Sequence, residues 1–125
     1  MAIRVLKGYH GNASRGVPFV SFNYKVKRAS FNKACILMMG LDSPEKHYLN
    51  VLVDDDRPSC FWFKTCDVSS PGARSLSATG AFTRTCAVGI LFDSFKLNPK
   101  VHKTLRVVWD PVEKAGRVDT SDVPV

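Results

Sequence analysis

Two groups of residues have the side-chain types that metal binding requires. Cys60 and Cys66 flank an aromatic segment, and three aspartates occupy positions 54–56. Zinc sites usually space a ligand pair by two to four residues, whereas Cys60 and Cys66 would lie about 20 Å apart along an extended strand. Consecutive carboxylates on a strand point to alternate sides, and Asp followed by Arg-Pro is typical of a turn. The sequence therefore predicts no metal site and no cofactor.

Cysteine-dependent catalysis would require a thiolate paired with a histidine. Cys35 lies within the apolar segment 34–41, whereas a reactive thiolate needs exposure and positive potential. His10, His47 and His102 are scattered along the chain, and no serine-nucleophile, phosphate-loop or dinucleotide-binding motif occurs. We therefore predict no catalytic residue and no small-molecule substrate, and an enzyme is the least favoured of three functional hypotheses.

Positive charge is concentrated at the start of the chain. The 125 residues have a formal net charge of +7. Residues 1–41 contain seven Lys and Arg and no Asp or Glu, whereas the basic and acidic residues of 42–125 cancel. Such asymmetry indicates a surface that faces a polyanion.

Basic and aromatic residues interleave within this segment, as nucleic-acid binding requires. Residues 22–27 alternate, which predicts a strand with Lys25 and Lys27 on its solvent face, and Arg28 and Lys33 follow at the start of a helix. Trp62 lies between Phe61 and Phe63, so its ring should point away from both and into solvent, where it could stack on a base. The predicted nucleic-acid-binding residues are Lys25, Lys27, Arg28, Lys33, Arg15 and Trp62.

Periodicity and turn residues predict the elements that position these side chains. Ser30 is the expected cap of a short helix that ends at Gly40. A second helix is expected to begin at Thr79 or Thr83 and to continue to about Phe95. The expected strands cover residues 3–7, 17–27, 47–54, 59–66, 73–78 and 103–109, and residues 119–125 should form a frayed tail.

These elements predict one α+β domain over residues 1–125, with a mainly antiparallel sheet or barrel of five to seven strands and two short helices. A motif of Phe, a basic residue and Cys recurs at residues 31–35 and 82–86, and a strand ending in Asp follows each copy. We therefore predict an internal duplication of a strand–helix–strand unit, with repeats at 17–66 and 73–118.

The start of the chain lacks the apolar run of a signal peptide, and the longest apolar segment is far shorter than a bilayer crossing. We therefore expect a cytoplasmic protein without a membrane partner. In such a compartment Cys35, Cys60, Cys66 and Cys86 should be free thiols rather than two disulfides.

The segment from Arg28 to Leu41 resembles the strand-to-helix segment of the AbrB-like swapped-hairpin transcription regulators. In that family a strand leads to a polar residue and a lysine, then to a short helix that ends in Gly-Leu. The resemblance is confined to this one segment, and Asp42-Ser43-Pro44 departs from the Gly-Asp turn of the family. It implies a dimeric β-barrel in which Arg28 and Lys33 contact DNA.

The principal functional hypothesis is non-enzymatic binding of nucleic acid, either DNA or RNA. The first alternative is a protein-interaction or assembly subunit, for instance of phage or mobile-element origin, whose basic face docks an acidic partner. The resemblance and the suspected repeat also leave a homodimer open. Neither the preferred strandedness of a nucleic acid nor its sequence follows from these residues.

Overall fold

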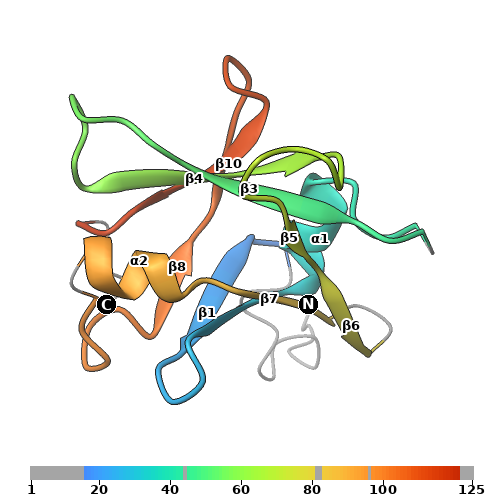
Figure 1. Ribbon diagram of the computed structural model, residues 1–125. Coiled ribbons are helices and arrows are strands. Elements are labelled where there is room, and N and C mark those ends of the chain that lie inside the picture. Colours follow the sequence, from blue (N-terminus) through green and yellow to red (C-terminus); the bar gives the residue numbers. More distant parts are fainter. Residues whose placement is uncertain (1–15, 44, 81–82, 96, 122–125) are drawn as a thin grey trace, which may run out of the picture.

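Two antiparallel sheets of five strands each make up the protein (Figure 1). The structure is a computed structural model and describes residues 16–43, 45–80, 83–95 and 97–121. Sheet A has the order β6-β7-β2-β1-β8, and sheet B has the order β5-β3-β4-β10-β9. The strands are β1 (Phe19–Asn23), β2 (Arg28–Phe31), β3 (Tyr48–Val53), β4 (Cys60–Cys66), β5 (Arg74–Ser75), β6 (Ser77–Gly80), β7 (Thr83–Ala87), β8 (Thr104–Arg106), β9 (Val108–Asp110) and β10 (Ala115–Asp119).

The chain passes directly from one sheet to the other at two corners. Only Leu76 separates β5 in sheet B from β6 in sheet A, and only Val107 separates β8 from β9. Both linking residues are buried. The predicted α+β class with an antiparallel sheet and two short helices is confirmed, although the described strands form two sheets and no closed barrel.

Aromatic side chains fill the space between the sheets. The Phe31 ring of sheet A meets the Phe63 ring of sheet B edge to face at 5.0 Å between centroids, and Phe22 similarly meets Phe61 at 6.5 Å. Phe31, Phe61 and Phe63 are almost fully buried. Burying each such ring contributes about 1.5–3 kcal/mol, so this cluster holds the layers together.

The first helix, α1 (Lys33–Met38), is shorter than predicted and has a different cap. Residues 28–31 form β2, because Ala29 and Phe31 face the core in alternation and pair with β1. The Asn32 side chain, rather than Ser30, caps α1 by accepting from the Cys35 N–H at 3.0 Å. The predicted stop at Gly40 is confirmed: its φ of 70° suits glycine, and the Leu41 N–H donates to the Ile36 carbonyl.

The second helix, α2 (Gly89–Ser94), is also short, and its predicted start was wrong. Residues 83–87 form strand β7 instead, which pairs with β2 on one side and β6 on the other. Thr83 and Thr85 are β-branched and favour a strand, and Cys86 faces the core. Residues 83–87 are therefore a strand because they pair with β2, although Thr83 could have capped a helix.

Strand β10 was not predicted, although it lies inside sheet B between β4 and β9. Its sequence, Ala-Gly-Arg-Val-Asp, is short and contains two residue types that strands usually avoid. Gly116 is needed there because a Cβ atom would lie 2.7 Å from the Val107 side chain. Asp119 belongs to this strand and the Thr120 N–H donates to the Ser59 carbonyl, so the frayed tail cannot begin at residue 119. Residues 122–125 and the strand predicted at 3–7 lie outside the described residues.

The same order of elements, hairpin then helix then hairpin, occurs in both halves of the chain. The pairings are also consistent with two equivalent halves, if β1 corresponds to the bent strand β5–β6 and β3 to the bent strand β8–β9. Then β2 pairs with its counterpart β7, and β4 pairs with its counterpart β10. The pair of β1 with β8 corresponds to the pair of β5 with β3. The helices begin at Lys33 and Gly89, which are further apart than the two motif copies at 31–35 and 82–86. The motif match was therefore misaligned, since Cys35 lies in α1 and Cys86 in β7. The duplication of 17–66 and 73–118 stays a prediction that the element order supports.

All four cysteines are free, as predicted. Burial raises the pKa of Cys35 to about 12 and that of Cys86 to about 11. Both thiols are thus protonated and inaccessible at neutral pH, whereas Cys66 is only half-buried. In native protein treated with a thiol-reactive disulfide reagent at pH 8, we expect Cys66 to react first and Cys35 and Cys86 only on the timescale of unfolding. Labelling of all four at equal rates, mapped by mass spectrometry, would contradict this expectation.

Candidate nucleic-acid interface

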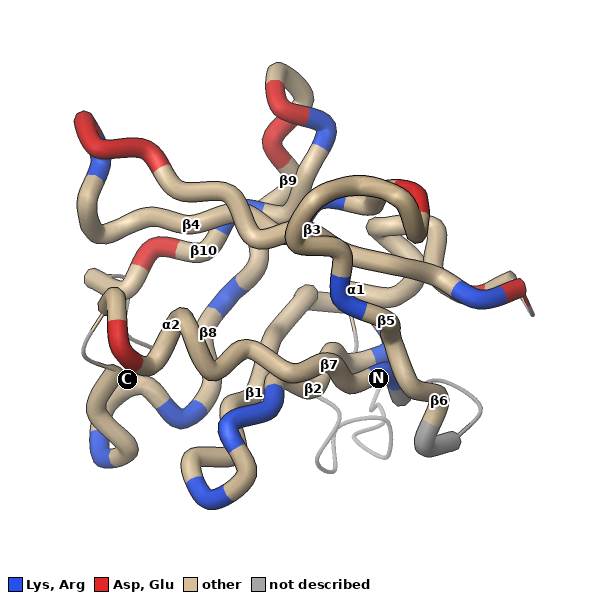
Figure 2. The backbone as a smooth tube through the Cα atoms, in the orientation of Figure 1, with Lys and Arg blue, Asp and Glu red and all other residues tan. Residues whose placement is uncertain are grey.

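The two sheets differ sharply in charge (Figure 2). The described strands of sheet A contain no acidic residue, and neither do the turn between β1 and β2 or residues 97–103 before β8. In contrast, the strands and turns of sheet B contain Asp54, Asp55, Asp56, Asp67, Asp110, Glu113 and Asp119. The basic residues of sheet A and these connections are Lys25, Lys27, Arg28, Arg84, Lys100, Lys103 and Arg106. The strands and turns of sheet B also contain Arg57, Lys64, Arg74, Lys114 and Arg117, so the acidic residues outnumber the basic ones there. A net positive charge thus belongs to sheet A rather than only to the first third of the chain.

The outer face of sheet A, which points away from sheet B, is rich in hydroxyl groups. Strand alternation and register place on it Phe19, Ser21, Asn23, Arg28, Ser30, Ser77, Thr85, Ala87, Thr104 and Arg106. Ser21 and Thr104 lie opposite each other, with their hydroxyl oxygens 3.2 Å apart. Such a surface offers hydrogen-bond donors and positive charge together, which phosphate groups require.

Lys25 and Lys27 lie in the β1–β2 turn and not on a strand face as predicted. The strand ends at Asn23 because its side-chain oxygen accepts from the N–H groups of Lys25 and Val26, at 3.0 and 3.3 Å. Lys27 has a φ of 54°, the left-handed conformation that closes the turn. Both lysines are exposed. They lie instead at the tip of the β1–β2 hairpin of sheet A.

Arg28 and Lys33 are at opposite ends of strand β2. The Arg28 guanidinium donates to the Thr85 hydroxyl at 3.1 Å, which holds it across the outer face of sheet A. Lys33 begins α1 beyond the other end of β2, more than about 13 Å along the strand. Lys33 is therefore not part of the predicted single patch with Lys25, Lys27 and Arg28. The prediction was wrong because it did not include a strand between Arg28 and Lys33. Arg15 lies outside the described residues.

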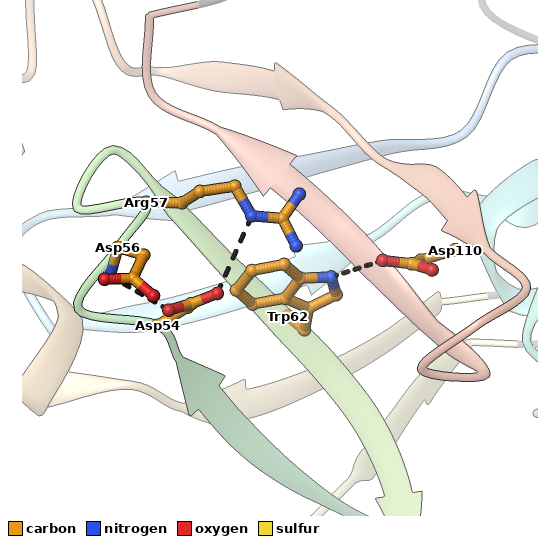
Figure 3. A network of polar contacts seen from close by, with 5 residues as sticks. All are labelled: Asp54, Asp56, Arg57, Trp62 and Asp110. Atoms are coloured by element: carbon orange, nitrogen blue, oxygen red, sulfur yellow. Dashed lines mark hydrogen bonds and ion pairs between the residues drawn. The ribbon is translucent and has the colours of Figure 1, made fainter.

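The prediction that Trp62 is exposed was wrong: its side chain is only 3% exposed. Its ring does point away from Phe61 and Phe63, onto the outer face of sheet B, but other side chains cover it there (Figure 3). The indole N–H donates to Asp110 Oδ2 at 2.9 Å, and the Arg57 guanidinium lies 4.8 Å from the ring centre. Trp62 is therefore a structural residue, and no base can stack on it.

Acidic groups surround Trp62. The indole hydrogen bond lowers the pKa of Asp110, so this carboxylate stays charged at neutral pH. A hollow of about 620 Å³ next to the ring is lined by Leu52, Val53, Asp54, Asp55, Asp56, Arg57, Trp62 and Glu113. The Asp54 side chain accepts from the Asp56 N–H at 2.9 Å, which confirms the predicted turn. This hollow would repel a nucleic acid.

A second hollow, of about 550 Å³, opens on the outer face of sheet A. Its lining residues are Phe19, Ser21, Asn32, Lys100, Val101, Lys103 and Thr104, and none is acidic. Phe19 is half-buried, whereas Lys100, Val101 and Lys103 are exposed. The hollow therefore combines an aromatic ring, two hydroxyls and two lysines within the layer that carries the positive charge.

Comparisons with known proteins gave no match. No protein-family model, no curated protein and no solved structure is similar to this chain. Neither α1 nor α2, the helices of the described ranges, is long enough to cross a membrane. Within the same ranges, no three His, Cys, Asp or Glu side chains gather as metal ligands would.

Lys100, Lys103 and Arg106 were not predicted as binding residues. The sum over residues 42–125 concealed them, because most acidic residues in that range belong to the strands and turns of sheet B. A local signal did exist: residues 94–109 contain basic residues and no acidic one. Phe19 adjoins these residues in space only because β1 pairs with β8.

Proposed function

We propose that this protein binds nucleic acid through the outer face of sheet A and the β1–β2 hairpin. The observation that carries the proposal is the separation of charge between the layers. A polyanion laid across sheet A would meet Lys25, Lys27, Arg28 and Lys103 at the hairpin end of β1 and Arg106 at its other end. The described strands of sheet A, the β1–β2 turn and residues 97–103 contain no carboxylate. Binding would release counterions from the phosphates, which is the main source of such affinity.

The geometry of the basic groups supports this proposal. Lys103 lies next to the hairpin, because its carbonyl accepts from the Phe22 N–H at 2.9 Å, one residue before the end of β1. Hydroxyls of Ser21, Ser30 and Thr104 lie between the basic side chains on the same face. Hydroxyls and cations together are typical of surfaces that contact the phosphate backbone.

The resemblance to the AbrB-like regulators is part of the proposal. Supporting it, the segment 28–41 does form a strand, a polar cap and a short helix that ends at Gly40-Leu41. A hairpin–helix–hairpin unit then occurs a second time in the same chain. The proposal carries over only Arg28 and Lys33 as DNA-facing residues.

A salt titration tests the proposed function. Contacts with about three or four phosphates predict a slope of roughly −2 to −4 in log K against log salt concentration. The measurement is fluorescence anisotropy of a labelled (dT)20 strand and of a labelled duplex of equal length, in increasing NaCl. No detectable affinity below about 100 μM at low salt would overturn the proposal. In that case, capture of an acidic protein in the presence of nuclease would support the interaction-subunit alternative instead.

A further inference from the structure

Hydrogen bonds fix the position of Phe19, which lines the hollow of about 550 Å³ on the outer face of sheet A. The Asn32 side chain accepts from the Phe19 N–H at 3.0 Å and donates to the Val17 carbonyl at 2.9 Å. The backbone N–H of Asn32 donates to the Phe19 carbonyl at 3.2 Å. The same Asn32 oxygen caps α1. Phe19 is thus fixed at its backbone on both sides, and alternation along β1 directs its ring outward, opposite Arg106.

The opposite side of the hollow is a loop that residues from two other segments hold in place. The His102 Nδ1 accepts from the Asn98 N–H at 2.9 Å, so Nε2 carries the proton and donates to the Thr120 carbonyl at 3.0 Å. The Tyr24 hydroxyl donates to the His102 carbonyl at 2.9 Å. These contacts fix residues 98–102 and hold Lys100 and Val101 beside the hollow, and Val101 remains 45% exposed.

Part of the lining of the hollow is polar. The Ser21 and Thr104 hydroxyls approach each other at 3.2 Å, and each can still offer a lone pair or a proton to a third group. A volume of about 550 Å³ is within the range of pockets that hold small organic groups. An aromatic ring, two hydroxyls and two exposed lysines in one lining match the face, the edge and the phosphate of one nucleotide.

We propose that this hollow receives an unpaired base, so that the protein prefers single-stranded to duplex nucleic acid. This inference rests on the proposed function. In a duplex the faces of the bases are stacked on one another and are not available to a side chain, whereas a single strand can turn a base onto an aromatic ring. Phe19 would stack on the base, and Lys100 and Lys103 would contact the adjoining phosphates.

Substitutions at Phe19 test the inference. We expect Phe19→Ala to weaken binding of a (dT)20 strand about 5- to 100-fold, the usual loss for one stacked base, and to leave duplex binding unchanged. Phe19→Leu retains apolar bulk without a ring and should lose nearly as much. Phe19→Trp should retain affinity, and its indole emission should be quenched by (dT)20 but not by a duplex of equal length.

The outcomes separate this inference from the proposed function. If neither strand type binds at low salt, the proposed function is wrong and the inference fails with it. If both bind, and Phe19→Leu and Phe19→Trp behave like the parent protein without quenching, only the base pocket is wrong. Should Phe19→Ala unfold, as judged by circular dichroism, the leucine and tryptophan variants still decide the question.

Discussion

Reversing the charge of Lys25 and Lys27 together is expected to abolish most nucleic-acid affinity, with a loss of about tenfold or more at low salt, equivalent to at least about 1.4 kcal/mol. Each substitution by Glu changes attraction for a phosphate into repulsion. The fold should survive, because both side chains are exposed and the turn is held by Asn23 and by backbone groups. Anisotropy with the labelled strands described above measures the loss, and circular dichroism checks the fold.

The chain contains a closely matched control for this experiment. Lys114 occupies the β9–β10 turn of sheet B with the same φ of 54° as Lys27, and it too is exposed. In that turn the Asp110 side chain accepts from the N–H groups of Val112 and Glu113, just as Asn23 does in the β1–β2 turn. Lys114→Glu should therefore change affinity by no more than about twofold, since its charge is screened from sheet A. Equal losses for Lys27→Glu and Lys114→Glu would mean that net charge, and not one face, governs binding.

Removing the Trp62 side chain should produce the largest loss of stability. We expect Trp62→Ala to lower the free energy of unfolding by about 3–5 kcal/mol, because the ring packs against Leu52, Cys60 and Ala115 beneath Arg57. Trp62→Phe retains a ring but removes the N–H donor of Asp110, at a cost of about 1.5–3 kcal/mol. Urea titration followed by circular dichroism and by the emission of Trp109 measures both.

The same variants report on function. Folded Trp62→Phe should bind nucleic acid like the parent protein, because the residue lies on sheet B, away from the proposed interface. A Trp62→Phe protein that is folded by circular dichroism but has lost affinity would instead place sheet B in the interface.

The local sequence pattern predicted the fold class and the β3–β4 hairpin. In that hairpin, both the alternation of the strands and the turn residues with three aspartates indicate the same structure. The local pattern failed where pairing between distant segments decides the structure. The sequence of β7 has the threonines of a helix cap, and only its pairing with β2 makes it a strand. The sequence of β10 is short and contains Gly and Asp, so no local pattern predicts a strand there. In both cases one of the two partner strands lies in the other half of the chain.

Only part of the candidate site was predicted, because pairing between distant segments also brings its residues together. Lys25, Lys27 and Arg28 follow from the charge of the N-terminal third of the chain, but Lys100 and Lys103 join them only through the pairing of β1 with β8. The alternation of side chains along a strand correctly predicted that the Trp62 ring points away from Phe61 and Phe63. It could not show that Arg57 and Asp110 cover that face, because Asp110 is 48 residues distant.

The pairings between the halves determine when this protein can fold during synthesis. The central strand of sheet A is β2 and that of sheet B is β4, and each pairs on one side with a strand of the second half, β7 and β10. While the ribosome has delivered only the residues through β4, strands β2 and β4 both present open edges. Such edges attract other chains. We therefore expect stable structure only after β10, which ends at Asp119, has been synthesised.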